Sequence, residues 1–459
     1  MIVSIVLAAG VGKRMYSKTP KILHKIAGRE IVKYAMDAVS LHSDLVVSVI
    51  SENIPSEIFT KSIISYQNLP LGTGDAVKKG LEAVPNVDND SLIIIVTGDN
   101  PLLKSDDVRE FIDFHGAKGN DISVLSALAD NPAGLGRIIR EGNKLVKIVE
   151  EVDATDREKQ VKEINTGVYI FKKSLLADAL NKISNSNSQG EYYLTDVLNV
   201  LKDSAKIGVK TLERKLPVYG VNNRYELALA SAVIQGEILK KHMIEGVTID
   251  NPQTVQIDFD VKIERDTRIL SGSIIEGNTH IGEGCVIGPY ARIIDSDIGS
   301  ESSIQMSVVM NSIVGENCTI GPFSYVRPEN LLARNVKIGT FVEVKKSRFN
   351  ENTKVPHLSY VGDATVGKDV NIGAGTITCN FSGLEGSKKN PTYIEDNVFI
   401  GSHTTLVAPI VVRKNAYTAA GSVITEEVPE DSLALGRSKQ VNKEGWVKRR
   451  KESNDKRST

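Results

Sequence analysis

Aliphatic residues recur at every sixth position through much of the second half of the chain. Three in-phase runs carry this pattern: Ile263, Ile269, Ile275, Ile281, Ile287 and Ile293; Val314, Ile320, Val326, Leu332, Ile338 and Val344; and Ile394, Ile400, Leu406 and Val412. Glycines stand between them at Gly282, Gly288, Gly315, Gly321, Gly339 and Gly401. Strands repeat every two residues and helices every 3.6, so this period predicts a parallel β-helix. Ordinary short strands with coincidental spacing do not account for three long runs.

The phase of this repeat changes along the chain. We expect a slip of one residue between the first two runs, and excursions at residues 345–354 and 379–393. Excursions from a regular solenoid are where binding groups tend to lie. The solenoid is predicted over residues 247–438. The basic tail 439–459 is most simply a solvated terminus, although Trp446 and Lys443 also suit a segment that folds over a neighbour.

The first half of the chain shows a different pattern, in which apolar strands alternate with helical segments. Strands are predicted at residues 2–7, 45–50, 92–96 and 167–171. This alternation is typical of an α/β domain with a mainly parallel sheet, predicted over residues 1–223. Between the two domains, residues 224–246 form a helical pattern that ends at Gly246. A helix of that length is a rod of roughly 30 Å, long enough to hold two domains apart.

Composition narrows the class of protein. The chain has 459 residues, of which 25% are charged, with a net charge of -1, so there is no electrostatic case for bulk nucleic-acid binding. No stretch reaches the length of a membrane span, and the first seven residues fit a strand better than a signal peptide. Cys285, Cys318 and Cys379 have no metal-ligand spacing and are predicted to be buried thiols in a reducing compartment. We therefore expect a cytoplasmic protein.

A glycine-containing segment follows the first strand. It comprises Leu7, Ala8, Ala9, Gly10, Val11, Gly12, Lys13 and Arg14, with Lys21 a few residues later. Glycines after a strand let backbone N–H groups approach phosphate oxygens, and Arg14 and Lys21 can neutralise the charge of a triphosphate. The segment lacks the Walker Lys-Ser/Thr pair and the third Rossmann glycine. Taken alone, it fits a structural turn better than a nucleotide site.

Thr97, Gly98 and Asp99 end the apolar run 92–96. This places the Asp99 carboxylate at the carboxyl edge of a central strand, where open α/β sheets bind ligands. On its position alone, Asp99 fits a helix N-cap equally well.

Further motifs accompany these residues: Gln67, 71–74, 134–137, Glu150, 165–167 and 220–224. Together they resemble the sugar-nucleotidyltransferase family. Over the whole chain, their order and spacing resemble the bacterial family of bifunctional N-acetylglucosamine-1-phosphate uridyltransferases and glucosamine-1-phosphate N-acetyltransferases. The resemblance implies an α/β Rossmann-like nucleotidyltransferase domain joined by a long helix to a left-handed parallel β-helix of hexapeptide repeats.

By that resemblance, the first domain transfers uridylyl from UTP to a sugar phosphate. Asp99 and Asn222 would hold Mg²⁺, while Arg14 and Lys21 would act on the UTP phosphates. Leu7, Ala8, Ala9, Gly10, Thr97 and Gly98 would surround the nucleotide, Gln67, Gly72 and Thr73 would read the uracil, and Gly136, Glu150 and Asn165 would hold the sugar. The sequence departs from the family at Lys13, usually Thr, and at Thr97, Tyr in some members.

A second group of motifs falls in successive coils of the predicted solenoid, at residues 323–328, 342–346, 357–363 and 371–376. A lone His in a solenoid is usually a surface or corner residue. His357, however, lies near Arg327, Lys345, Tyr360 and Asn371 in the coil order. Amine acetylation needs a group that accepts a proton as nitrogen attacks a thioester, and a His that titrates near neutrality suits that role.

The resemblance makes His357 the general base of an acetyltransferase. It assigns Arg327, Lys345, Tyr360, Asn371, Asn380 and Phe381 to the glucosamine phosphate, and Ala374, Ser402, Ala420, Arg437 and Lys443 to acetyl-CoA. Phe381 stands where the family usually has Tyr, and the loop 383–388 looks longer than usual.

The expected function is acetylation of glucosamine-1-phosphate, followed by uridylyl transfer to N-acetylglucosamine-1-phosphate. The expected partners are these substrates and, by resemblance, two further copies of the chain in a homotrimer, without nucleic acid or stable membrane association. One alternative is a nucleotidyltransferase whose solenoid only assembles subunits. Another is a binding protein that has kept the fold without the chemistry, against which Arg14, Lys21, Asp99 and His357 argue.

Overall fold

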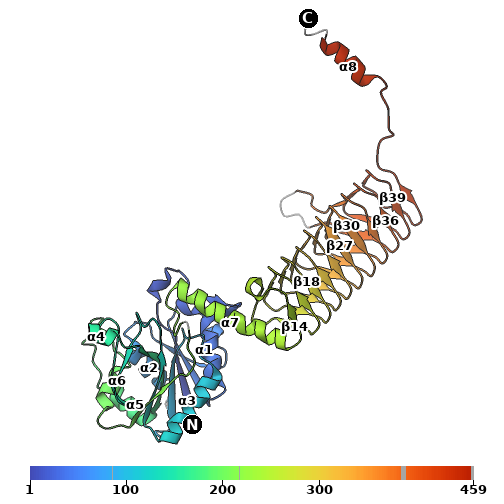
Figure 1. Ribbon diagram of the computed structural model, residues 1–459. Helices are drawn as coiled ribbons and strands as arrows, with labels where there is room; N and C mark the ends of the chain where they lie inside the picture. Colours follow the sequence, from blue (N-terminus) through green and yellow to red (C-terminus); the bar gives the residue numbers. More distant parts are fainter. Residues whose placement is uncertain (85, 217, 384–388, 456–459) are drawn as a thin grey trace. The chain divides into compact units, whose positions relative to one another are not determined.

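The computed structural model describes residues 1–84, 86–216, 218–383 and 389–455. The chain divides into two compact units, Met1–Ile238 and Leu239–Thr459 (Figure 1). Each unit has its own arrangement of strands, so each is described by itself.

The first unit is built on a mainly parallel sheet. Its strand order is β11 (Ile207–Thr211), β7 (Ile122–Leu128), β10 (Glu163–Lys172), β6 (Leu92–Thr97), β1 (Ile2–Leu7), β4 (Leu45–Ile50) and β5 (Ile63–Tyr66). Only β10 runs antiparallel to its neighbours along this path. A hairpin of β8 (Arg137–Glu141) and β9 (Lys144–Val149) joins at β10, and β2 (Lys25–Ile26) pairs with β3 (Arg29–Glu30). The four predicted strands are confirmed.

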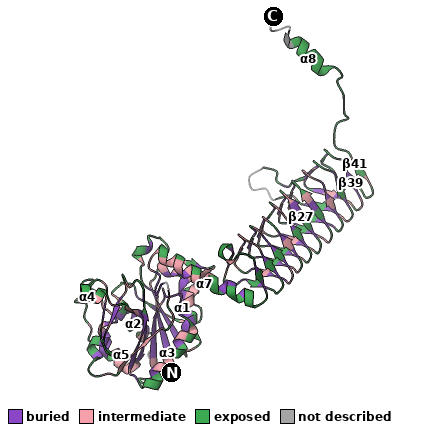
Figure 2. Cartoon of the chain, in the orientation of Figure 1, coloured by how far each residue is buried: buried purple, intermediate pink, exposed green. Residues whose placement is uncertain are grey.

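Helices cover both faces of this sheet. Buried side chains of α2 (Thr73–Glu82), α5 (Lys173–Leu180) and α6 (Asp196–Leu201) pack with Ile5 and Ile95 on one face. Those of α1 (Ile31–Ser40) and α3 (Ser105–Lys118) pack with Val6 and Val96 on the other. Figure 2 shows the sheet buried between helices whose outer faces are exposed. Shorter helices are η1 (Lys13–Met15), η2 (Lys21–Leu23), η3 (Ser56–Phe59) and α4 (Asp156–Lys159).

The helix α7 (Arg224–Ile244) follows, as the sequence predicts, and Gly246 after it has φ +99°. No helix within the described ranges is long and apolar enough to cross a membrane.

The second unit is a solenoid of three parallel sheets. The first sheet contains β12 (Thr248–Ile249), β15 (Arg268–Ile269), β18 (Val286–Ile287), β21 (Ser303–Ile304), β24 (Thr319–Ile320), β27 (Lys337–Thr340), β30 (Lys354–His357), β33 (Asn371–Ile372), β36 (Phe399–Ile400), β39 (Tyr417–Thr418) and β41 (Leu433–Ala434). The second contains β13 (Gln256–Ile257), β16 (Ile274–Glu276), β19 (Arg292–Ile294), β22 (Val308–Met310), β25 (Tyr325–Val326), β28 (Glu343–Lys345), β31 (Tyr360–Gly362), β34 (Ile377–Cys379), β37 (Thr405–Val407) and β40 (Val423–Ile424). The third contains β14 (Lys262–Ile263), β17 (His280–Ile281), β20 (Asp297–Ile298), β23 (Ile313–Val314), β26 (Leu331–Leu332), β29 (Arg348–Phe349), β32 (Ala364–Val366), β35 (Thr392–Ile394) and β38 (Ile410–Val412).

The sixteen aliphatic residues of the three runs all point into the solenoid and are buried, which confirms the six-residue period. The predicted slip of one residue is wrong. Between Ile293 and Val314 the inward residues are Ile298, Ile304 and Val309, so three of the four steps span five residues. Each shortened step turns two residues after the inward residue, at Asp295, Met306 or Asn311, whereas the six-residue step between Ile298 and Ile304 turns three residues after it, at Glu301; all four corner residues have positive φ.

The predicted excursion at 345–354 is also wrong. The strands β28, β29 and β30 continue the coil without a break, and the inward position is filled by Phe349 after another five-residue step. The second excursion is confirmed, because residues 380–391 separate β34 from β35. The long-loop prediction falls partly on residues 384–388, which lie outside the described residues.

Two further features complete this unit. The element η4 (Pro252–Thr254) lies in the first coil, and α8 (Trp446–Asp455) ends the described chain. Cys285 and Cys318 are buried as predicted, but Cys379 is exposed, because it occupies an outward position at the end of β34.

Candidate active sites

The carboxyl edge of the central strands carries the first candidate site. Leu7 at the end of β1 lies opposite Thr97 at the end of β6, so the segments that follow these strands meet. A cavity of about 470 Å³ opens there. Its lining includes the predicted residues Leu7, Ala9, Gly10, Arg14, Lys21, Gln67, Gly72, Thr73, Thr97, Asp99 and Asn222. Ala8 and Gly98 lie behind it, where their amides donate to Val49 O and Leu7 O.

Four polar side chains converge at one end of this cavity. Lys21 Nζ pairs with Asp99 Oδ2 and donates to Asn222 Oδ1 at 3.2 Å. Arg14 Nη2 donates to the same Asn222 oxygen at 3.1 Å. Burial alone would raise the pKa of Asp99, but the ammonium of Lys21 beside it holds that pKa below its ordinary value. The arrangement places two cationic side chains and two oxygen ligands within reach of one bound group.

Local backbone geometry makes this convergence possible. Gly12 has φ +66°, and a Cβ built there would lie 2.5 Å from Lys21 Cβ. A larger residue at position 12 would therefore displace Lys21. Gly10 has nothing within 4 Å of its hypothetical Cβ, which leaves its backbone open to a ligand. Gly12 thus lets Lys21 pack close to the turn after β1, and Gly10 leaves the backbone of that turn accessible.

Asn222 is held in a defined orientation from behind. Its Nδ2 donates to Gly220 O at 3.2 Å, so Oδ1 faces the two cations. Its backbone N–H donates at 2.7 Å to Glu226 Oε2, in the first turn of α7. Glu226 also receives a 2.8 Å hydrogen bond from Asn223 Nδ2.

The Asp99 and Asn222 oxygens fit a magnesium ion, since both face one cation, the Lys21 ammonium. Mg²⁺ is usually bound by one or two protein oxygens, with water and substrate phosphates completing its shell. No group of three or more His, Cys, Asp or Glu side chains able to hold a metal occurs in the described part of the chain. The donor set therefore fits an ion that arrives with a polyphosphate better than an ion enclosed by protein.

The far end of the cavity is formed by the loop between β5 and α2. Residues 191–194 clamp this loop: Tyr192 N–H donates to Leu71 O, and Gly74 N–H donates to Tyr192 O at 2.7 Å. The Thr73 hydroxyl oxygen accepts from Leu194 N–H at 3.0 Å. A Cβ on Gly72 would lie 2.5 Å from Tyr192 O, so only glycine fits there. The loop that would read a base is thus rigidly held.

Gly136, Glu150 and Asn165 form a separate cluster on the β8, β9 and β10 side of the sheet. A Cβ on Gly136 would lie 3.3 Å from Glu150 Oε2 and 3.4 Å from Asn165 Cβ. Asn165 Nδ2 donates to Tyr169 Oη at 2.6 Å. Burial raises the pKa of Glu150, and Asp153 and Asp196 add to this effect. The three predicted sugar-binding residues therefore lie together.

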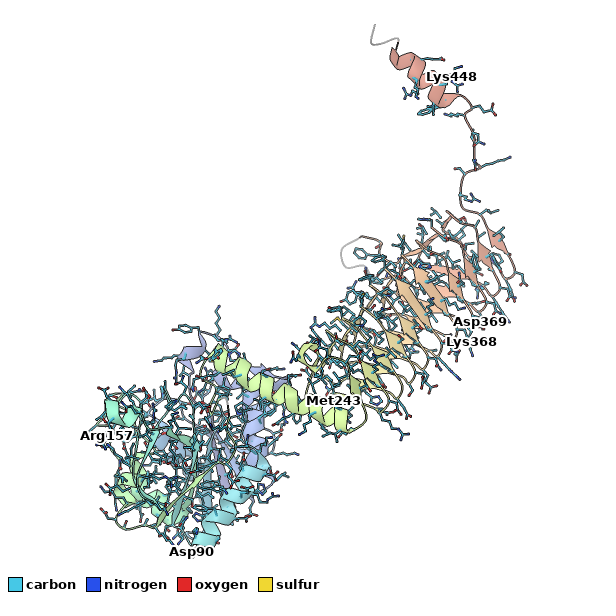
Figure 3. The ribbon with its side chains drawn as sticks, in the orientation of Figure 1. Asp90, Arg157, Met243, Lys368, Asp369 and Lys448 are labelled. Atoms are coloured by element: carbon cyan, nitrogen blue, oxygen red, sulfur yellow. The ribbon has the colours of Figure 1, made fainter. Side chains whose placement is uncertain are left out.

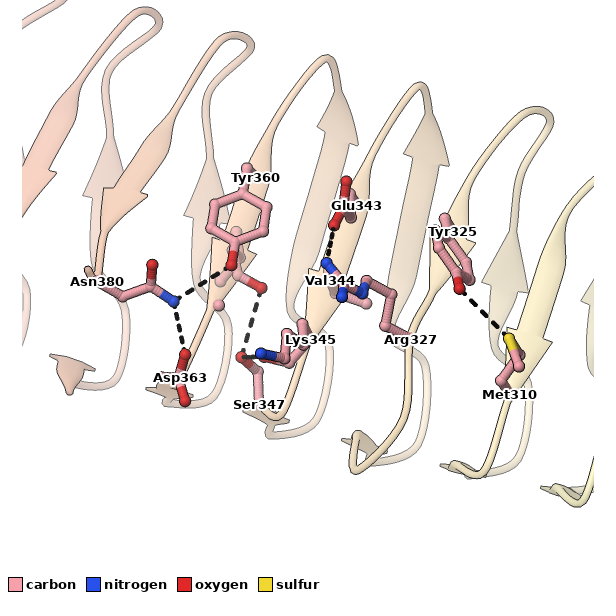
Figure 4. Close-up of polar contacts among 12 residues, drawn as sticks. Met310, Tyr325, Arg327, Glu343, Val344, Lys345, Ser347, Tyr360, Asp363 and Asn380 are labelled. Atoms are coloured by element: carbon pink, nitrogen blue, oxygen red, sulfur yellow. Dashed lines mark hydrogen bonds and ion pairs between the residues drawn. The ribbon is translucent and has the colours of Figure 1, made fainter. Parts of the chain in front are cut away.

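The second candidate site lies on the outer face of the second solenoid sheet. Arg327 Nη1 donates at 2.8 Å to Glu343 Oε1 on the next coil, and Tyr360 lies opposite Glu343 one coil further (Figure 4). Asn380 Nδ2 donates to Tyr360 Oη at 3.2 Å and to Asp363 Oδ2 at 2.6 Å. Lys345 is level with Gly362, between these pairs. Four of the predicted sugar-phosphate residues are therefore gathered on neighbouring coils.

A column of predicted residues runs along the adjoining corner. His357, Ala374, Ser402 and Ala420 each precede the corner residue of their coil, namely Leu358, Gly375, His403 and Gly421. Backbone hydrogen bonds link these corners in register: Gly375 N–H to Leu358 O, His403 N–H to Ala374 O, and Gly421 N–H to Ser402 O. At about 4.8 Å per coil, the column is about 14 Å long. Arg437 Cδ reaches within 3.9 Å of a Cβ built on Gly421, at the end of the column.

Three predicted residues do not join these groups within one chain. Asn371 pairs with Lys354 on the first sheet. Lys354 lies three residues before His357 in β30, so Asn371 is displaced from His357 by about 10 Å along the strand direction. Lys443 is exposed before α8, and no described contact links it to the column. Phe381 is 55% exposed and lies under Lys389 Nζ, which is 3.8 Å from its ring centroid.

Sequence reasoning missed several side chains that complete these sites. They are Asp75, Glu226, Glu343, Asp363 and Lys389. Only Glu226 carried a local signal, because an acid three residues after Asn223 is the pattern of a helix N-terminus. The others act through partners that the fold brings together.

Known proteins are similar to both units. Residues 4–182 match the family model of the MobA-like NTP transferase domain, residues 257–338 the GMPPB C-terminal domain, and residues 391–426 the hexapeptide repeat of succinyl-transferase.

Curated relatives match nearly the full length. The Bifunctional protein GlmU of Caldanaerobacter subterraneus subsp. tengcongensis is 48% identical over 455 residues, which cover 98% of both chains. The proteins of the same name from Thermoanaerobacter pseudethanolicus and Fervidobacterium nodosum are each 45% identical, over 98% of this chain and 98% and 97% of their own. The chain therefore belongs to the GlmU family and is a bifunctional transferase that combines a uridyltransferase with an acetyltransferase.

Proposed function

We propose that the solenoid acetylates glucosamine-1-phosphate with acetyl-CoA, and that the first unit then transfers uridylyl from UTP to the N-acetylglucosamine-1-phosphate produced. The observation that carries the proposal is the alignment of His357 with Ala374, Ser402 and Ala420 beside the cluster of Arg327, Lys345, Tyr360 and Asn380. It provides a proton acceptor, two cationic side chains that can bind a phosphate, and a row of corner residues in one region of the surface.

In the acetyl step, the amine nitrogen of the sugar attacks the thioester carbonyl carbon. His357 accepts the proton that this nitrogen loses, while the carbon–sulfur bond breaks and the coenzyme thiolate leaves. Arg327 and Lys345 bind the sugar phosphate, and the Asn380 amide faces the sugar. The long coenzyme lies along the column toward Arg437.

In the uridylyl step, a phosphate oxygen of the sugar phosphate attacks the α-phosphorus of UTP, and pyrophosphate leaves. The attacking phosphate is already anionic, so the step needs positioning and charge neutralisation rather than a base. Arg14 and Lys21 neutralise the triphosphate, Gln67 and Gly72 receive the uracil, and Gly136, Glu150 and Asn165 hold the sugar. Mg²⁺, held by Asp99 and Asn222 when bound, would stabilise the charge on the phosphates.

Two variants test the assignment in one assay that contains glucosamine-1-phosphate, acetyl-CoA, UTP and Mg²⁺, with one substrate omitted at a time. His357→Ala is expected to slow thiol release by about 10² to 10⁴ and to leave pyrophosphate release from N-acetylglucosamine-1-phosphate unchanged. Lys21→Ala is expected to do the reverse. If His357→Ala retains full thiol release, the solenoid is an assembly scaffold and the two-site proposal is wrong.

We also propose that the chain works as a homotrimer whose acetyltransferase site lies between subunits. Asn371 lies on the first sheet, level with Lys354 and therefore about 10 Å along the strand direction from the corner between His357 and Tyr360. A neighbouring copy would supply the missing side. Light scattering should give three times the chain mass of 49.9 kDa, and a monomer with full acetyl transfer would overturn this part.

The proposed compartment is the cytoplasm. The described thiols of Cys285, Cys318 and Cys379 are all free, which suits a reducing environment. Fractionation of cells should place the chain with cytoplasmic enzymes, and recovery with the membranes after a salt wash would contradict this.

A further inference from the structure

The amide of Gln67 is held in one orientation at the base end of the first cavity. Gln67 follows β5 and is buried, and its Nε2 donates to Gly72 O at 3.0 Å and to Asp75 Oδ2 at 2.8 Å. A carbonyl and a carboxylate accept hydrogen bonds and have none to donate. If the amide were rotated by a half turn, Oε1 would face two acceptors, so the observed orientation is chemically determined.

This orientation leaves Oε1 as the atom that Gln67 can offer to a ligand. Among the described residues, no donor reaches Oε1, and Gln67 lines the cavity together with Gly72 and Thr73. The surrounding loop is clamped to Tyr192 and Leu194, so Gln67 cannot easily turn away. The base end of the cavity therefore presents a fixed hydrogen-bond acceptor.

We propose that Asp75 is a positioning residue that sets the preference of the first unit for uracil over cytosine. It fixes the Gln67 amide so that Oε1 accepts a hydrogen bond from N3–H of uracil. Cytosine has a lone pair at N3, so CTP would bring two acceptors together and leave both without a donor. The inference rests on the proposed uridylyl transfer and deepens it, because it names the atom that distinguishes the two nucleotides.

Asp75 differs in its role from an ordinary acidic residue near a helix N-terminus. It lies in the first turn of α2, where a carboxylate favours helix formation. That effect would change stability but not the choice between two pyrimidines. Asp106 in the first turn of α3 pairs with Arg109 and is distant in sequence from Gln67, so it provides the matched control.

The test measures kcat/KM with UTP and with CTP, using the full chain, N-acetylglucosamine-1-phosphate and Mg²⁺. In Asp75→Asn the new amide can donate as well as accept, so Gln67 can rotate and offer Nε2 to cytosine N3. The ratio of kcat/KM for UTP to kcat/KM for CTP is expected to fall about tenfold. The preference is reduced and not abolished, because Gly72 O still favours the original orientation of the Gln67 amide. Asp106→Asn should leave the ratio unchanged.

A double-mutant cycle shows whether Asp75 acts through Gln67. In a Gln67→Ala background, Asp75→Asn should not change the ratio further. Asp75→Ser, which also removes the carboxylate, serves as a second variant, and a thermal unfolding profile like that of the parent shows that the first unit is folded. The inference is overturned if the ratio of kcat/KM for UTP to kcat/KM for CTP stays within twofold of the parent in both Asp75→Asn and Asp75→Ser. It is also overturned if Asp75→Asn lowers this ratio equally in the Gln67→Ala background. Failure of the parent chain to use UTP would instead overturn the proposed function.

Discussion

At the scale of single residues, the Asn380 amide illustrates how a corner residue, Asp363, can orient a side chain of the proposed acetyltransferase site. Asp363 has φ +51°, and its carboxylate accepts from Asn380 Nδ2, which fixes the orientation of this buried amide beside Tyr360 (Figure 4). We predict that Asp363→Gly lowers kcat/KM for glucosamine-1-phosphate about tenfold, because the amide loses its fixed orientation. Glycine tolerates the left-handed backbone, so the corner itself should persist. Thiol release at varied sugar phosphate measures the effect.

The control for this variant is Asp295→Gly. Asp295 turns the same edge of an earlier coil with φ +45°, and its carboxylate accepts from Asn278 N–H instead of a site residue. It should leave acetyl transfer unchanged. Equal losses in the two variants would mean that Asp363 only supports the coil.

The family resemblance predicted that Arg14, Lys21, Asp99 and Asn222 share a site, whereas the residues alone fitted a structural turn better and left Asp99 equally suited to a helix N-cap. The structure adds that these four contact one another. Side chains that act through another residue were not predictable. Asp75 is defined by its hydrogen bond to Gln67, and nothing in the local sequence indicates that contact.

At the scale of the coil, polar side chains also stack from one turn to the next. On the third sheet, His280 Nδ1 contacts Asp297 Oδ1 at 2.9 Å and Nε2 contacts Glu264 Oε1 at 3.2 Å, on the coils to either side. At other corners, such as the one near Lys368 and Asp369 labelled in Figure 3, Asn352 Nδ2 donates to Asp369 Oδ1. Side-chain hydrogen bonds between neighbouring coils therefore stabilise the solenoid surface, in addition to the packing of its aliphatic core.

The His280 contacts predict a pH dependence of stability. The hydrogen bond to Asp297 raises the pKa of His280, and Glu264 adds to the shift. A folded-state pKa above the unfolded value means that the stabilisation is complete below about pH 6.5 and is lost as pH rises through the folded pKa. The thermal midpoint of the parent should exceed that of His280→Gln at about pH 6, and the difference should shrink by about pH 8. Asp297→Asn should flatten the same profile, whereas a constant difference would contradict the prediction.

The period of six was sufficient to predict the coil, since most inward positions are apolar and fill a narrow core, with Thr378 and Thr418 as buried polar exceptions. The period did not predict where the step between two inward residues shortens to five residues. The five-residue and six-residue steps both turn at a corner residue with positive φ, and these residues include Met306 and Lys346 as well as Asn and Asp. Because such conformations have no unique residue code, the break at 345–354 resembled an excursion in the sequence.

At the scale of the whole molecule, one corner of the solenoid exposes a ladder of large apolar side chains. Tyr290, Phe323, Phe341 and Leu358 occupy this corner, and the rings of Phe323 and Phe341 stack with centroids 5.5 Å apart. Phe341 is 58% exposed in the single chain. Contiguous exposed apolar surface of this kind marks an interface, and its last member, Leu358, follows His357 directly.

The ladder predicts that assembly and acetyl transfer fail together. Phe341→Asp places a charge at a left-handed corner that Asp tolerates, so the coil should remain folded while association weakens. Light scattering should show loss of the proposed trimer. Acetyl transfer should fall at least about tenfold, because in that proposal a neighbouring chain completes the site, and pyrophosphate release should stay within about twofold. Ile313→Asp changes an equally exposed aliphatic residue on the third sheet and should preserve both assembly and acetyl transfer. A Phe341→Asp trimer with normal acetyl transfer would show that the ladder lies outside the interface, and a monomer with normal acetyl transfer would show that one chain contains the whole site.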